Sequence, residues 1–149
     1  MTQQRSVGGK PTVARRAVAE GRLTLSAPTC RAIGAGRVAK GDPIGAGELA
    51  GLLAMKRTPE LIPHCHTVPL TGSRVVLRVG RRTVSVRAEA EAFDRTGVEM
   101  EALVGATVAL LTVWDMVKYL EKDARGLYPR TALGPVRVRT KAKGSVNQR

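Results

Sequence analysis

The sequence predicts an α+β sandwich, in which an antiparallel sheet is packed with helices on one face. Residues 83–93 alternate strictly between apolar and polar side chains, and residues 74–79 are rich in β-branched residues, so both are expected to be strands. Gly80, Arg81 and Arg82 join them as a hairpin. Residues 98–121 carry apolar side chains at the helical period. Two strands in direct succession favour an antiparallel sheet over a parallel βαβ arrangement.

The segments before the hairpin have weaker patterns. Residues 12–25 alternate loosely and are expected to form a strand, residues 28–35 a short helix, and residues 40–43 a turn. From residue 46 to residue 56 the leucines recur at spacings of three and four, which predicts an amphipathic helix. Its apolar face would hold Leu49, Leu52 and Leu53, and Pro59 and Pro63 would end it.

The segments after the hairpin are a long helix and a last strand. Gly97 marks the start of the helix, whose predicted core face consists of apolar residues at helical spacing: Ala102, Leu103, Ala106, Leu110, Val113, Val117 and Leu120. A loop over residues 123–131 leads to a strand at 136–139 and a basic tail. We predict one domain over residues 1–149, with residues 1–9 and 144–149 as flexible ends.

The sequence also carries signals about location. It contains no run of about twenty apolar residues, so we expect no membrane-spanning segment. The first residues lack the apolar core of a signal peptide. Cys30 and Cys65 are too few for a disulfide framework and suit a reducing compartment, so we expect a cytoplasmic protein.

The net charge of +13 is held by the two ends of the chain. Residues 1–41 contain eight basic residues and one acid, residues 124–149 contain seven basic residues and no acid, and the middle is nearly neutral. Such ends attract polyanions, whether DNA, RNA or the phosphates of a small molecule. The four aromatic residues are too scattered for a base-stacking platform. A basic solvated surface is an equally good interpretation.

The two histidines of the chain stand close together, in Ile62-Pro63-His64-Cys65-His66. In an extended segment, His64 and His66 would point to one side and Cys65 to the other. These residue types can bind zinc, but the sequence has no CxxC, no HExxH and no third histidine, so a metal is the least favoured interpretation. Hydrogen bonding within a turn and a functional role both stay open.

The long helix carries two groups of charged residues. Asp115 and Lys118 lie three apart on one helical face, where a surface ion pair is the simplest interpretation. Glu99 and Glu101 flank Met100 near the helix start. Glu101 and Asp115 are about 21 Å apart on a straight helix, so they cannot share one compact site within a single chain. If both are functional, they contact opposite ends of a large substrate or a second subunit completes each site, and the latter favours an oligomer.

Four motifs, in this order and at compatible spacing, resemble the molybdenum cofactor biosynthesis protein C family, the cyclic pyranopterin monophosphate synthases. They are Lys40-Gly41-Asp42, the segment from Lys56 to His66, the segment from Thr96 to Ala102, and Trp114-Asp115-Met116-Val117-Lys118. Residues 118–131 look more like archaeal members than bacterial ones. The resemblance implies a ferredoxin-like fold and a homohexamer, a trimer of dimers with active sites at the dimer interfaces.

The resemblance also implies a reaction. The family's lyase activity converts (8S)-3′,8-cyclo-7,8-dihydroguanosine 5′-triphosphate, a purine nucleoside triphosphate derivative, to cyclic pyranopterin monophosphate and releases diphosphate. No cofactor, metal, membrane or specific nucleic acid is expected as a partner. Opening and reclosing rings requires acid–base catalysis, and the triphosphate requires cations.

The family's functional residues map onto positions of this chain. The resemblance implies that Asp115 is the catalytic acid or base, with Lys118 beside it and Lys40 taking part in the chemistry. It implies substrate contacts from one larger set of residues: His64, Cys65, His66, Met100, Glu101, Glu99, Lys56, Arg15 and Lys143. Of these, Lys56, Arg15 and Lys143 are expected to contact phosphate.

Some residues depart from the family pattern. Ser6-Val7-Gly8 replaces Met-Val-Asp, Thr67 replaces a proline, Glu48 replaces an arginine in the first helix, and the glycine-rich tail is reduced. Two alternatives to the synthase therefore stay open. One is a basic nucleic-acid-binding module, and the other is a catalytically impaired member of the family that still binds nucleotide.

Overall fold

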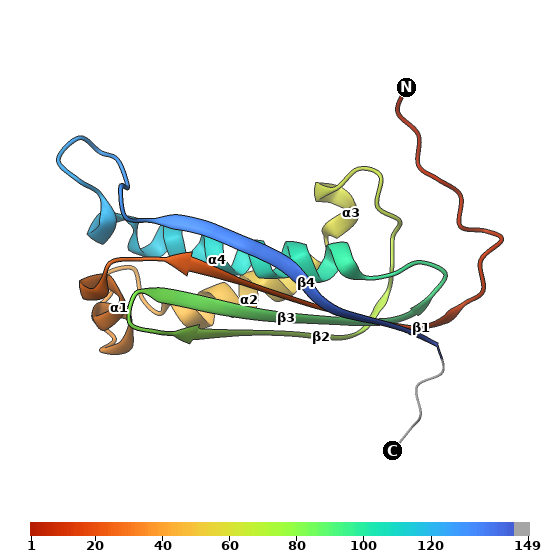
Figure 1. The fold of residues 1–149 in the computed structure, drawn as a ribbon, viewed down its shortest axis with the longest axis horizontal. Helices are drawn as coiled ribbons and strands as arrows, with labels where there is room; N and C mark the ends of the chain where they lie inside the picture. Colours follow the sequence, from red (N-terminus) through yellow and green to blue (C-terminus); the bar gives the residue numbers. More distant parts are fainter. Residues whose placement is uncertain (145–149) are drawn as a thin grey trace, which may run out of the picture.

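The computed structural model describes residues 1–144 as a four-stranded antiparallel sheet with helices on one face (Figure 1). The elements are β1 (Val13–Thr24), α1 (Ala27–Gly34), α2 (Pro43–Met55), α3 (Thr58–Leu61), β2 (Leu70–Val79), β3 (Thr83–Asp94), α4 (Glu99–Glu121) and β4 (Ala132–Gly144). The strand order is β2-β3-β1-β4, with each neighbouring pair antiparallel. The α+β, ferredoxin-like class predicted from the sequence is confirmed.

The elements with the strongest sequence patterns were predicted most accurately. β3 buries the alternating residues that the pattern assigned to the core, from Val84 to Ala92. In β1, which pairs with β3 over its whole length, Ala17, Ala19 and Leu23 belong to the same core. Helix α4 covers this face and contacts β1, β3 and β4. The core therefore lies between the sheet and α4.

Helix α4 buries most of its predicted face, but Leu120 is 40% exposed. By length and composition alone this helix could cross a membrane, contrary to the expectation that no such stretch exists. Half of the stretch is nevertheless buried inside the fold. A core helix of a folded domain passes the same test, so α4 is weak support for a membrane span.

Helix α2 differs from the prediction in its start and in its buried face. Asp42 accepts a hydrogen bond from Ile44 N–H (3.0 Å) and caps the helix, which therefore begins at Pro43. Of the three leucines predicted for the apolar face, Leu49 and Leu53 are 59% and 51% exposed, whereas Leu52 is partly buried and packs against the core. The buried residues of the helix are Pro43, Gly47, Gly51, Ala54 and Met55. The glycines allow a close approach to α4, since a Cβ atom on Gly51 would lie 2.8 Å from the Gly105 carbonyl.

Two more elements extend beyond their predicted bounds. Pro59 lies in the first turn of the short helix α3, which the sequence did not predict. β4 runs from Ala132 to Gly144, so the predicted basic tail is largely part of the sheet. Of the predicted flexible ends, residues 1–9 contain no helix or strand and Gly144 ends β4, while 145–149 lie outside the described residues.

Candidate active site

Lys40, Asp115 and Lys118 form a compact cluster of opposite charges. Lys118 Nζ lies 2.8 Å from Asp115 Oδ1, and the two residues are neighbours on α4. Lys40 Nζ lies 3.6 Å from Asp115 Oδ2 and donates to the Asp115 carbonyl at 3.0 Å. The structure therefore brings together the three residues that the resemblance implied as catalytic.

The local chain explains how Lys40 reaches α4. Lys40 lies between α1 and α2, and the turn around it uses Gly41 at a φ of 111°, a conformation that favours glycine. The buried side chain of Val38 anchors this segment in the core, and Ala39 N–H donates to the Tyr119 hydroxyl at 2.7 Å. These contacts fix the main chain directly before Lys40, whose ammonium group reaches Asp115.

The electrostatics of this cluster keep Asp115 ionised. The hydrogen bond from Lys118, and then the charges of Lys118 and Lys40, lower the pKa of the Asp115 carboxyl. The hydrogen bond to Asp115 in turn raises the pKa of Lys118. Asp115 is exposed to solvent, with 60% of its side chain accessible, so a ligand can reach it. The cluster offers one carboxylate that can accept a proton and two ammonium groups that can bind an anion.

The His64–His66 segment forms a turn and is not extended. Cys65 N–H donates to the Ile62 carbonyl at 3.0 Å, so the predicted alternation of histidine and cysteine faces does not occur. His64 is exposed, whereas Cys65 and His66 are half-buried. The N-terminal segment lies along this turn and contacts it: Gln4 Nε2 donates to the Cys65 carbonyl at 2.8 Å, and His66 Nε2 lies 2.6 Å from the Arg5 carbonyl.

Glu101 is the buried acid of the candidate site. It is only 3% exposed, and its burial, together with the nearby charges of Glu99 and Asp94, raises its pKa. Burial, and then the charge of Glu101, raises the pKa of the Cys65 thiol. The thiol is therefore held in its neutral form, which does not suit a nucleophile. Cys65 and Glu101 thus lie near each other, at the end of α4 opposite to Asp115.

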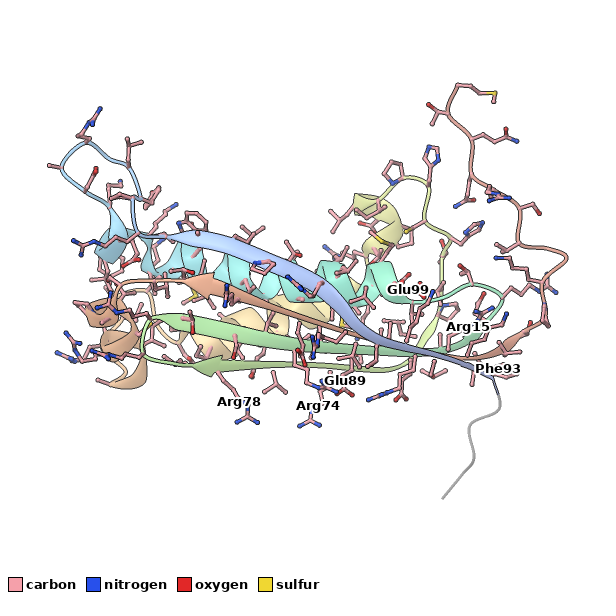
Figure 2. The ribbon with its side chains drawn as sticks, in the orientation of Figure 1. Arg15, Arg74, Arg78, Glu89, Phe93 and Glu99 are labelled. Carbon is pink, nitrogen blue, oxygen red and sulfur yellow. The ribbon has the colours of Figure 1, made fainter. Side chains whose placement is uncertain are left out.

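A third group lies where β1, β4 and the start of α4 meet. Arg15, Glu99 and Lys143 line one cavity of about 150 Å³, which Lys141 also lines. Figure 2 shows Arg15 and Glu99 at this end of the molecule. Lys141 Nζ lies 3.7 Å from Glu99 Oε1, and Arg15 donates to the Arg95 carbonyl at 3.1 Å. This cavity combines several cations with one carboxylate, and its cations suit the binding of phosphate oxygens.

A β-bulge places Lys141 and the predicted phosphate contact Lys143 on the helix face of the sheet. In β4, Arg137 pairs with Glu20, whose side chain lies on the sheet face without helices, and Arg139 also contacts Glu20. A register shift between Val18 and Ala19 inserts one residue into β4, so Lys141 pairs with the core residue Ala17. Lys141 and Lys143 therefore move to the helix face. Simple alternation would have kept them beside Arg137.

Two further residues, Lys56 and Met100, were predicted to contact the substrate. Lys56 is the exposed C-cap of α2, and Met100 is 37% exposed at the start of α4. Within residues 1–144 the side chain of Lys56 forms no ion pair or hydrogen bond. In the same part of the chain, no three His, Cys, Asp or Glu side chains converge as metal ligands would.

Glu48, the reversed charge in α2, has a structural partner. Its Oε1 accepts a hydrogen bond from Leu77 N–H at 3.0 Å. β2 is an edge strand, and this carboxylate satisfies one of the main-chain donors on its outer side. The residue therefore secures α2 to the sheet, and its charge is already engaged there.

The predicted site residues thus lie toward the two ends of α4. Asp115, Lys118 and Lys40 lie toward one end, and Glu99, Glu101 and the His64–His66 turn lie at the other. On this single helix, Glu101 and Asp115 are about 21 Å apart. One chain therefore does not bring all the predicted site residues together.

Comparisons with known proteins agree on one group of relatives. The model of the MoaC family matches residues 4–144 of this chain. A protein of Thermococcus kodakarensis named "Probable cyclic pyranopterin monophosphate synthase" is 51% identical over 138 residues, which cover 93% of this chain and 88% of that protein. Proteins of the same name from Methanosarcina acetivorans (49% identical, 93% and 87% covered) and Pyrococcus abyssi (48% identical, 92% and 86% covered) are similar along almost their whole length. These sources are archaeal, as the sequence of residues 118–131 predicted.

Proposed function

Because the chain belongs to the MoaC family, we propose that it is a cyclic pyranopterin monophosphate synthase, a lyase of molybdenum cofactor biosynthesis. Its substrate in this proposal is the cyclised dihydroguanosine triphosphate, a small molecule derived from a guanosine nucleotide. The reaction opens and rebuilds the purine ring as a pterin, closes a cyclic phosphate and releases diphosphate. The observation that carries the proposal is the Lys40–Asp115–Lys118 cluster, where the residues from two separate motifs meet.

The charges of the two groups suit different steps of this chemistry. Asp115 is kept as a carboxylate by two lysines, so we assign it to proton removal at neutral pH. Glu101, whose pKa is raised by burial, retains a proton more readily and is assigned to substrate binding and proton donation. Lys118 and Lys40 are assigned to stabilising negative charge as bonds break.

The cavity around Glu99 is proposed to hold part of the triphosphate. Four basic residues line it, and Glu99 supplies a second acid there: Arg15, Arg16, Lys141 and Lys143. Lys56, His64 and His66 are proposed as further substrate contacts. The triphosphate carries several negative charges, so a group of cations at one end of the site supports its binding.

We further propose that each active site is shared between two chains of a homohexamer. The two partial sites on α4 are too far apart to act on one small substrate. A two-fold dimer would bring the Glu101 end of one chain to the Asp115 end of its partner, because such an interface pairs each patch with the other. Three such dimers give an assembly of about 95 kDa, which light scattering would detect.

The direct test incubates the purified protein with the cyclised nucleotide and follows diphosphate and the cyclic pterin product. We expect turnover by the natural sequence and none above background by Asp115→Asn or Lys118→Ala, with the assembly unchanged. Glu60→Gln, on the exposed side of α3, is a control that leaves the charge clusters intact. A well-folded protein that forms no product would refute the synthase and favour a nucleotide-binding member without catalysis.

A mixing experiment tests the shared site. Asp115→Asn and Glu101→Gln chains are unfolded together and refolded as mixed oligomers. If each site uses Glu101 of one chain and Asp115 of another, every mixed dimer regains one intact site, and about a quarter of all sites recover. If both residues act within one chain, mixing restores nothing.

We place the protein in the cytoplasm on the basis of its free cysteines. Cys30 is buried and Cys65 half-buried, and neither forms a disulfide. Thiols in this state suit a reducing compartment.

A further inference from the structure

The first residues of the chain are hydrogen-bonded to the His64–His66 turn. Gln4 Nε2 donates to two successive main-chain carbonyls, those of Cys65 at 2.8 Å and His64 at 3.3 Å. The carbonyl of the next residue, Arg5, lies 2.6 Å from His66 Nε2. Three hydrogen bonds thus join two adjacent residues of the N-terminal segment to three successive residues of the turn. We call residues 1–9 the N-terminal arm.

The turn has little other support. It lies between α3 and β2, outside any helix or strand. Within residues 1–144, the hydrogen bond from Cys65 N–H to the Ile62 carbonyl is its one other hydrogen bond, and it is internal to the turn. His64 is exposed and His66 is half-buried. The contacts with the N-terminal arm are therefore what ties the histidine side chain and its main chain to a second segment.

The contact with Arg5 also determines the protonation of the ring. A main-chain carbonyl oxygen can only accept a hydrogen bond, so His66 Nε2 must be the donor and must carry the proton. In the neutral ring, Nδ1 is then the acceptor and stays available to a ligand. A histidine whose tautomer is fixed by a main-chain carbonyl presents one defined atom to its substrate.

We propose that two residues of the N-terminal arm, Gln4 and Arg5, belong to the active site, with the Gln4 side chain and the Arg5 carbonyl as positioning groups for the histidine turn. Gln4 fixes the main chain of His64 and Cys65, and the Arg5 carbonyl fixes the orientation and tautomer of His66. The arm thereby turns His66 Nδ1 into an acceptor for a donor group of the substrate. The catalytic consequence rests on the proposed function, whereas the tautomer does not.

Nuclear magnetic resonance tests the tautomer independently of any activity. The chain contains two histidines, so selective ¹⁵N labelling of the histidine rings gives two sets of signals, with exposed His64 as an internal reference. We expect the neutral His66 ring to be protonated at Nε2 and unprotonated at Nδ1, with a ring N–H protected from solvent exchange. Deletion of residues 2–5 is expected to remove that protection. A His66 ring protonated at Nδ1, or protection that survives the deletion, would overturn the proposal.

Kinetics tests the positioning role with a matched pair of variants. Gln4→Ala removes the donor to the turn, whereas Gln3→Ala removes the same side chain from the neighbouring position, which makes no hydrogen bond to the turn in the described residues. We expect Gln4→Ala to raise KM by about three- to tenfold, the range of one neutral hydrogen bond, with a smaller change in kcat. Gln3→Ala should leave both constants unchanged.

The two experiments separate the possible failures. If the natural sequence forms no product, the proposed function fails and the resonance of His66 still decides whether the arm sets its tautomer. If the natural sequence is active and Gln4→Ala matches it in KM and kcat, the positioning role is refuted.

Discussion

Helix α4 carries two buried glutamates, Glu101 in its first turn and Glu121 at its last residue, and they are stabilised in opposite ways. Both are almost inaccessible, 3% exposed for Glu101 and 9% for Glu121. Burial, and then the charges of Glu99 and Asp94, raises the pKa of Glu101. Burial acts in the same direction on Glu121, but hydrogen bonds from Ser26, Thr29 and Thr131 outweigh it and lower its pKa.

The difference lies in the donors around each carboxylate. Glu121 accepts from Ser26 N–H at 2.9 Å, from the Ser26 hydroxyl at 2.6 Å, from the Thr29 hydroxyl, and from the Thr131 hydroxyl at 2.9 Å. It therefore joins the cap of α1, the end of α4 and the start of β4. For Glu101, its own main chain supplies the hydrogen bond that opposes the rise. A buried carboxylate without such donors is costly to keep charged, so we expect a functional role for Glu101 and a structural one for Glu121.

The largest expected effect is on turnover by Glu101→Gln. The substitution keeps the size of the side chain but removes the titrating proton, so we expect the rate to fall by about 10²- to 10⁴-fold. Because Glu101 lacks strong donors, the urea midpoint should stay the same or rise. Steady-state assays and urea denaturation at one protein concentration measure both quantities.

The matched control is Glu121→Gln, which changes the same chemical group at the other end of the helix. Any folded protein that it yields should keep a turnover rate close to that of the natural sequence. If Glu121→Gln abolished turnover in folded protein while Glu101→Gln did not, the assignment of structural and functional roles would be reversed.

The next effect in size is the loss of stability in Glu121→Ala. Removing this carboxylate leaves Ser26 N–H and the hydroxyls of Thr29 and Thr131 without their acceptor. We expect the free energy of unfolding to fall by about 3 kcal/mol, since each buried donor without a partner costs 1–3 kcal/mol. Glu60→Ala, on an exposed position of α3, is the control and should leave the urea midpoint unchanged. Equal midpoints for Glu121→Ala and Glu60→Ala would show that the donors do not stabilise the fold.

The sequence predicted elements well where the pattern depends on a single packing surface. Strand β3 packs one face on the core, and α4 packs one stripe on the sheet, so hydrophobic periodicity identified both. Helix α2 has two neighbours, α4 and the edge strand β2. Its contact with α4 uses glycines, which have no hydrophobic side chain to reveal a buried face. Of the leucines that dominated the pattern, Leu49 and Leu53 are exposed and Leu52 packs against the core.

The geometry of the candidate site was also predicted only in part, because some of its contacts depend on the tertiary fold. Asp115 and Lys118 are neighbours on one helix, and local spacing was enough to pair them. The approach of Lys40 depends on the tertiary fold and was implied only by the family resemblance. Lys141 and Lys143 face the helices because of an inserted residue in β4, which alternation cannot indicate, and the role of Lys143 was implied only by the family resemblance. The contact of Gln4 with the histidine turn joins positions 61 residues apart and has no sequence signal.

The smallest expected effect is on the pH dependence of stability, and it tests the comparison most directly. The folded pKa of Glu121 is lowered, so its stabilisation is complete above the unfolded value near 4.5 and is lost as the pH falls through the folded pKa. The folded pKa of Glu101 is raised, so its contribution is present below that value and is lost as the pH rises through the folded pKa.

Each glutamate therefore makes the free energy of unfolding depend on pH, with opposite signs for the two residues. Substitution by glutamine should remove that dependence. Glu121→Gln should flatten the loss of stability on the acidic side of pH 4.5, and Glu101→Gln should flatten the loss on the other side. Urea denaturation from pH 3 to pH 8, at one protein concentration because assembly contributes to stability, gives both differences. If the stability of both variants, relative to the natural sequence, changed with pH in the same direction, the donors around Glu121 would not distinguish it from Glu101. Opposite slopes would mean that hydrogen-bond donors, more than burial, decide which glutamate of α4 holds a proton.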